Sequence, residues 1–128
     1  MNRLILLIVL SSNVLLAQKA KKIKAEDLIN CWSRSFEDEN QNAKVAAFRN
    51  CDYQFPPRIY RPTVKLEANG KCQILHIGES DIRSFKEGTW TFSKRKKRVT
   101  VINGNKVIEM KFRIKKMEKD FIISDWEL

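Results

Sequence analysis

Residues 108–115 read Ile-Glu-Met-Lys-Phe-Arg-Ile-Lys, with an apolar residue at every even position and a charged residue at every odd one. Successive side chains of a β-strand point to opposite faces of the sheet, so this period of two predicts a strand that is buried on one face only. Ile108, Met110, Phe112 and Ile114 then face a hydrophobic core. The alternation therefore favours an all-β fold built around a single core.

Shorter segments of the same kind lie along the rest of the chain. Asn-Gly pairs at residues 69–70 and 103–104 predict tight hairpins, because both positions tolerate a positive φ. Strands are predicted at residues 32–36, 60–66, 72–77, 88–92, 98–102, 108–115 and 121–126, whereas residues 43–48 have a helical composition. Hairpin-linked strands of this length form sandwiches or barrels, and closing the sheet removes its exposed edges. We expect a small up-and-down antiparallel β-barrel of seven to eight strands.

The chain of 128 residues is 43% hydrophobic and 31% charged, which suits one globular domain, and its formal net charge is +10. Its first 17 residues have the order of a signal peptide: a basic start, an apolar run at residues 4–10, and Ala17 at the cut. An uncleaved membrane anchor is the alternative, but the apolar run is short for a span. We divide the chain into a leader (1–17), a basic solvated spacer (18–27) and a barrel domain (28–128). The mature protein is expected to be exported, to the periplasm or beyond the cell.

Three cysteines, Cys31, Cys51 and Cys72, allow at most one internal disulfide in an oxidising compartment. If the predicted strands run up and down, the start of the first strand and the start of the third lie at the same end of the barrel. This placement predicts a Cys31–Cys72 bond, with Cys51 near the other end. The alternative is three buried, reduced cysteines that act as small apolar side chains.

Several short motifs follow one another in the chain: Trp32, Phe48-Arg49, Phe55-Pro56-Pro57, Arg61, Asn69-Gly70, Asp81 and Gly88-Thr89-Trp90. Their order and spacing resemble those of small bacterial lipocalin-like (calycin-type) proteins, over about Leu28 to Trp126. The resemblance implies a compact up-and-down barrel, in which Asp81 stabilises a turn. It also implies a function, because lipocalin relatives commonly hold small hydrophobic molecules inside the barrel.

A ligand inside the barrel would contact the large side chains of its inner face. The candidates are Trp32, Tyr60, Leu66, Trp90, Phe92, Met110, Phe112 and Ile114. Side chains of this size can also fill an eight-stranded barrel completely, so a packed core without a pocket is the alternative. Arg61 is expected to stack on Trp90 and seal one end. The leading hypothesis is a non-enzymatic, monomeric domain that binds a small hydrophobic molecule.

Five consecutive basic residues provide a second hypothesis: Lys94, Arg95, Lys96, Lys97 and Arg98. In an exported protein they could bind an anionic surface of the cell envelope, with an affinity that falls as salt rises. The alternative is a solvated turn that prevents edge pairing. No aromatic residue interrupts the run, which argues against single-stranded nucleic acid as the partner.

Residues suited to catalysis or metal binding are few. His76 is the only histidine, and no spacing places a cysteine nucleophile beside it. The three cysteines lack the spacing of a zinc site, and there is no glycine-rich loop for a nucleotide phosphate. We therefore expect no catalytic residues, no metal and no cofactor.

Overall fold

The computed structural model describes residues 22–41 and 44–128, and the predicted leader lies outside them. The elements are η1 (Ala25–Leu28), β1 (Asn30–Arg34), η2 (Phe36–Asp38), β2 (Val45–Asn50), β3 (Thr63–Leu66), η3 (Ala68–Gly70), β4 (Lys71–Ile77), η4 (Glu79–Asp81), β5 (Arg83–Ser93), β6 (Arg98–Asn103), β7 (Ile108–Glu118) and β8 (Phe121–Trp126), where η denotes a 3-10 helix. No helix in this part of the chain is long and apolar enough to cross a membrane.

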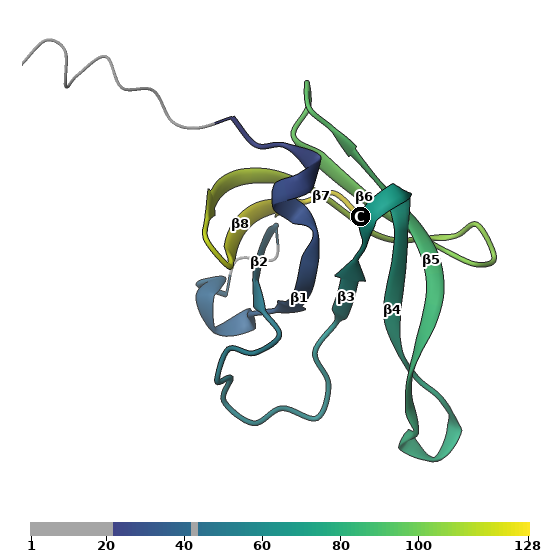
Figure 1. Ribbon diagram of the computed structural model, residues 1–128. Helices are drawn as coiled ribbons and strands as arrows, with labels where there is room; N and C mark the ends of the chain where they lie inside the picture. The colour runs from purple at the N-terminus through teal and green to yellow at the C-terminus, as the bar shows by residue number, and fades with distance from the viewer. Residues whose placement is uncertain (1–21, 42–43) are drawn as a thin grey trace, which may run out of the picture.

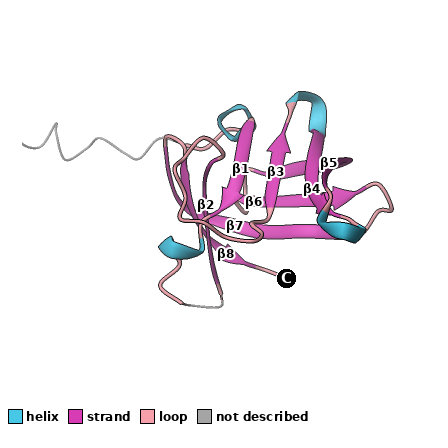
Figure 2. Ribbon diagram, turned by 90° about the horizontal axis from the view of Figure 1, so that it is seen from below, coloured by secondary structure: helices cyan, strands magenta, loops and turns pink. Residues whose placement is uncertain are grey.

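The eight strands close into one antiparallel barrel, which confirms the predicted fold class (Figures 1 and 2). Around the ring the order is β1-β2-β8-β7-β6-β5-β4-β3. From β3 to β8 each strand pairs with the next in sequence, and the β1–β2 hairpin fills the remaining gap. Because β2 and β3 are both antiparallel to β1, residues 51–62 must return along the barrel from the end of β2 to the start of β3.

Strand β2 includes residues 45–48, for which the composition predicts a helical turn. Ala46, Ala47 and Phe48 have no exposed surface, and β2 pairs with β1 on one side and β8 on the other. The Ser124 hydroxyl also donates to the Ala46 carbonyl oxygen at 2.7 Å. Pairing and burial on both sides outweigh the local helical preference of alanine.

Large side chains fill the barrel. Six of the eight predicted interior residues are at most 6% exposed: Trp32, Leu66, Trp90, Met110, Phe112 and Ile114. Phe92 is half-buried and packs against this core. The Phe48 and Phe112 rings stack with their centroids 4.6 Å apart, and Phe48 is an interior residue that the predicted lining omits.

Tyr60 is not an interior residue, contrary to the prediction. Its side chain is 39% exposed, because β3 begins at Thr63 and Tyr60 lies on the preceding connection. Pro62 has no N–H to donate to a neighbouring strand, so the strand begins after it. The apolar alternation in the sequence, which begins at residue 60, is therefore longer than the strand.

Two bulges change the phase of β7. Glu109 is an extra residue opposite β6, so Ile108 pairs with Ile102 and is 42% exposed instead of facing the core with Met110. Lys115 is an extra residue opposite β8. This second bulge turns Met117 back towards the core and leaves both Lys115 and Lys116 on the outer face. A bulge shifts the face of every residue beyond it, which a strict period of two does not anticipate.

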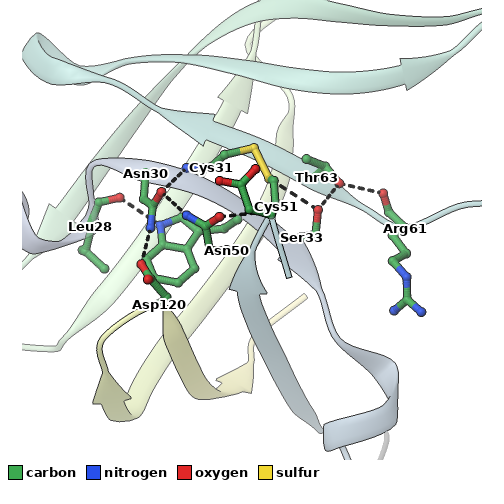
Figure 3. Close-up of a disulfide and its surroundings, with 11 residues drawn as sticks. Leu28, Asn30, Cys31, Ser33, Asn50, Cys51, Arg61, Thr63 and Asp120 are labelled. Atoms are coloured by element: carbon green, nitrogen blue, oxygen red, sulfur yellow. Dashed lines mark hydrogen bonds between the residues drawn. A yellow bond between two sulfur atoms is a disulfide. The ribbon is translucent and has the colours of Figure 1, made fainter. Parts of the chain in front are cut away.

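The disulfide joins Cys31 to Cys51, so the predicted Cys31–Cys72 pair is wrong (Figure 3). Cys31 lies in β1 and Cys51 directly follows β2, where its N–H donates to the Cys31 carbonyl oxygen at 3.1 Å. Cys72 is 1% exposed on the inner face, whereas Cys31 precedes the inward-facing Trp32 and faces outward. A bond between Cys31 and Cys72 would have to pass through the sheet. The error follows from the missed strand β2, whose end is the true neighbour of Cys31.

Arg61 holds the 51–62 connection against the barrel. Its guanidinium donates two hydrogen bonds of 2.7 Å to the Glu37 carboxylate and one of 2.8 Å to the Pro56 carbonyl oxygen. It stacks 4.4 Å from the centroid of the Phe55 ring, so Arg61 packs on Phe55 rather than on Trp90. The ion pair holds the pKa of Glu37 at about 2, chiefly through the hydrogen bonds from Arg61.

Candidate functional site

At one end of the barrel the β4–β5 hairpin extends beyond the neighbouring strands β3 and β6. β3 pairs with β4 only as far as Ile74, and β6 pairs with β5 only from Gly88 onward. Residues 75–77 and 83–85 therefore pair with each other alone and extend beyond the ring (Figure 1). We call this end the mouth.

A cleft of about 770 Å³ lies at the mouth, between the hairpin, the 51–62 connection and the β6–β7 turn. Its lining consists of Tyr60, Ile74, Leu75, His76, Ile77, Lys86, Glu87, Asn103, Gly104, Asn105 and Glu109. Ile74 is 7% exposed and belongs to the core cluster, so the cleft reaches the top of the packed interior. We call this hollow the mouth cleft.

The lining of the mouth cleft is mixed in character. Tyr60 and the apolar residues of β4 provide hydrophobic surface, while Lys86 provides one positive charge and Glu87 and Glu109 provide two negative charges. Asn103 donates from its side-chain amide to the Glu109 carboxylate at 2.7 Å, which orients that carboxylate at the β6–β7 turn. Burial, and then the nearby negative charge of Glu109, raise the pKa of Tyr60, so its hydroxyl stays protonated and can donate a hydrogen bond.

Several exposed apolar side chains lie on or beside the segments that form the mouth. The described part of the chain has nine large apolar side chains that are strongly exposed, and seven of them lie on the 51–62 connection, the β4–β5 hairpin or residues 104–108. Tyr53 is near the start of the connection; the other six, which we call the apolar rim, are Ile59 (89%), Tyr60, Ile82 (67%), Phe85, Val107 (56%) and Ile108. The Arg83 guanidinium donates to the Ile59 carbonyl oxygen and joins two of these segments. Exposed apolar surface gathered around one hollow is typical of binding sites.

The opposite end of the barrel is closed by η1. Leu28 is fully buried there, and its carbonyl oxygen accepts a 2.9 Å hydrogen bond from the Trp32 indole N–H (Figure 3). Ile23, within the predicted spacer, also packs against the core. A polar network joins Asn30 to Asn50 and to Asp120 beside a smaller hollow of about 420 Å³. The polar groups of this network bond to one another, and η1 covers the core at this end of the barrel.

Few residues of the mouth cleft are predicted from the sequence. Of the eight predicted lining residues only Tyr60 borders it, while the others form or adjoin the packed core. The cleft depends on the part of β5 before Gly88, which the prediction of a strand at residues 88–92 leaves out. The polar and apolar residues at 83–87 do not alternate clearly, so only the pairing with β4 reveals this part of the strand.

The predicted basic run and the remaining reactive groups lie elsewhere. Lys94–Lys97 form the turn between β5 and β6, and Arg98 begins β6. Cys72 is the free cysteine, and burial raises its pKa to about 11. Within residues 22–41 and 44–128, no three His, Cys, Asp or Glu side chains are grouped so that they could hold a metal ion.

Comparison with known proteins adds no family assignment. No protein-family model, curated protein or solved structure matches the chain. The closed eight-stranded antiparallel barrel is consistent with a lipocalin-like fold, and the functional argument depends on the site alone.

Proposed function

We propose that this protein is an exported, non-enzymatic, lipocalin-like barrel that binds one small hydrophobic molecule in the mouth cleft. The observation that carries the proposal is the mouth cleft together with the apolar rim, whose six strongly exposed side chains lie on or beside the segments that form the mouth, and of which Tyr60 also lines the cleft. An apolar ligand would cover surface that is otherwise in contact with water, and that transfer is favourable.

The site is placed at the mouth because the interior is occupied. Trp32, Phe48 and Phe112 are each at most 2% exposed and lie where an enclosed ligand would have to be. Ligand pockets commonly have volumes of about 300–1,000 Å³, and the mouth cleft, at about 770 Å³, falls within that range.

The lining also favours a particular chemistry. Ile74 and Tyr60 would contact the apolar body of the ligand, while Lys86, Glu87 and Glu109 offer one positive and two negative charges to a polar group at its other end. The cleft lining contains no serine, threonine or cysteine that could act as a nucleophile. We therefore propose reversible binding of a small amphipathic molecule with a hydrocarbon body and a polar end.

Export is supported by the composition of residues 1–17 and by the Cys31–Cys51 bond, since disulfides persist in oxidising compartments. Lipocalin-like character is supported by the closed barrel and by Trp32 near the start of β1, whose indole is tied to the segment that closes the barrel.

The test is titration with 8-anilinonaphthalene-1-sulfonate, a fluorescent anion with an apolar body, in 0.5 M NaCl to screen nonspecific charge binding. We expect saturable binding of one dye per protein, which Tyr60→Ala weakens about five- to tenfold through lost apolar contact. Tyr53→Ala is the matched control, because Tyr53 is 46% exposed on the same connection but does not line the cleft. Non-saturable binding, or an equal loss in the control, would contradict the proposal. Native mass spectrometry after incubation with an envelope lipid extract would then identify the natural ligand.

A further inference from the structure

The β5–β6 turn continues the sheet instead of standing away from it. The backbone N–H of Ile114 in β7 donates to the Lys97 carbonyl oxygen at 2.8 Å, and in the next register position Arg98 lies opposite Arg113. This bond places the four basic residues of the turn beside the middle of β7. The basic run therefore belongs to a larger surface.

β7 adds its own cations to that surface. Met110, Phe112 and Ile114 face the core, so the residues between them, Lys111 and Arg113, face outward. Lys115, the extra residue of the second bulge, also points to solvent, with a side chain that is 55% exposed. We call the combined surface the basic face and define it by Lys94, Arg95, Lys96, Lys97, Arg98, Lys111, Arg113 and Lys115.

Two carboxylates neutralise part of the basic face. Glu127 accepts hydrogen bonds from Arg98, and Asp125 pairs with Arg113 and Lys115. Eight cations less these two anions leave a formal charge of +6, more than half of the chain's net charge of +10. A shallow groove of about 600 Å³ crosses the same surface, between the turn and β7.

We propose that the basic face docks the protein electrostatically onto an anionic lipid bilayer. Lysines near an anionic membrane act as point charges in its surface potential, which suits cations spread over a turn and a strand. Arg98 and Arg113 already have carboxylate partners, so their planar guanidinium groups are not free for directional recognition of a soluble anion. The eight residues that define the basic face include no apolar side chain, and Leu128, which is 60% exposed, directly follows Glu127 at the edge of the face, so contact with the headgroups is mainly electrostatic.

The test uses the exported protein, purified without its leader, and sedimentation with vesicles of phosphatidylcholine containing 30% phosphatidylglycerol. We expect binding at 0.05 M NaCl that is largely lost at 0.5 M, because salt screens surface charge, and little binding to vesicles of phosphatidylcholine alone. Binding to the neutral vesicles, or binding that salt does not weaken, would overturn the proposal. So would binding to soluble polyphosphate with none to the anionic vesicles.

Three double variants locate the surface. Each cation near an anionic membrane contributes about fivefold to binding, so Lys94→Gln with Lys96→Gln should weaken it about 30-fold. Lys111→Gln with Lys115→Gln should do the same with the turn intact. The control, Lys65→Gln with Lys71→Gln, removes the same charge from β3 and β4, with β3 lying four strands from β7 around the ring.

The control pair should bind nearly as well as the original protein, and an equal loss there would show that net charge alone drives binding and would overturn the proposal. Urea unfolding of each variant checks that it folds. The basic face and the mouth cleft share no residue, so this test and the dye titration succeed or fail independently.

Discussion

Removing the Cys31–Cys51 bond, by Cys31→Ala with Cys51→Ala, should destabilise the barrel through the unfolded state. The backbone hydrogen bond between these residues and the β1–β2 ladder that begins beside them do not require the sulfur atoms. The folded structure therefore loses little. The unfolded chain, in contrast, loses a cross-link between residues 20 positions apart and gains conformational entropy.

The size of the effect follows from loop closure. A closed loop of about 20 residues corresponds to about 3 kcal/mol at 25 °C in the chain-entropy treatment. With a urea slope of about 1.5 kcal/mol per M for a domain of this size, the unfolding midpoint should fall by about 2 M. The melting temperature should fall by about 12 °C.

The assay is urea unfolding followed by tryptophan fluorescence, with and without a phosphine reductant. The reductant should lower the midpoint of the original protein by the same amount and leave the double variant unchanged. Cys72→Ala should retain the full response to the reductant, because Cys72 is outside the bond. A response below about 0.5 M would refute the entropic argument, and a Cys31–Cys72 peptide in a non-reduced digest would refute the pairing.

Gly88→Ala should destabilise the protein by about 1–3 kcal/mol, because an added Cβ would lie 2.4 Å from a backbone oxygen of β6. Gly104→Ala, where the nearest atom is 3.5 Å away, should change stability by less than about 0.5 kcal/mol, and equal urea midpoints for the two would contradict the packing argument. The pKa of Glu37 is about 2 in the folded protein, so its pair with Arg61 stabilises the fold above about pH 4.5, and this contribution is lost as the pH falls towards 2. The stability difference between the original protein and Glu37→Gln should shrink over that interval, and a constant difference in acid unfolding would count against the pair. Burial raises the pKa of Cys72 to about 11, so at pH 8 the folded protein should react with iodoacetamide at least tenfold more slowly than the urea-unfolded chain, and equal rates would show that the thiol is accessible.

Prediction from sequence worked where one strand carries its own signal. In β7 the alternation identifies Met110, Phe112 and Ile114 as core residues, since an inward-facing position needs only a local period of two. It failed at Ile108, because a bulge is a matter of pairing with the neighbouring strand and leaves the alternation in the sequence unchanged.

Strand β2 shows how one local error spreads. Ala46 and Ala47 have a helical preference that only their neighbours β1 and β8 override. Without β2, the predicted second strand begins near Tyr60, and the third begins at Cys72. Cys51 is then placed at the end of the barrel opposite Cys31, and Cys72 remains as the apparent partner. Cys72 does lie at the same end as Cys31, but on the opposite face of the sheet.

The mouth cleft was beyond sequence reasoning for a similar reason. Its lining comes from β4, β5, the β6–β7 turn and the 51–62 connection, and these segments meet only because the ring closes. Lys86 and Asn105 carry no pattern that marks them as neighbours. The basic run was visible in sequence, but its continuation through Lys111 and Arg113 required the register between β6 and β7.

The amino-acid sequence by itself determined the fold class and most of the core, because alternation and Asn-Gly turns act over a few residues. The tertiary structure decided the position of β2, the Cys31–Cys51 bond and the mouth cleft. Each of these depends on which distant strands pair and in what register, and free energy gained only in the closed barrel selects that pairing.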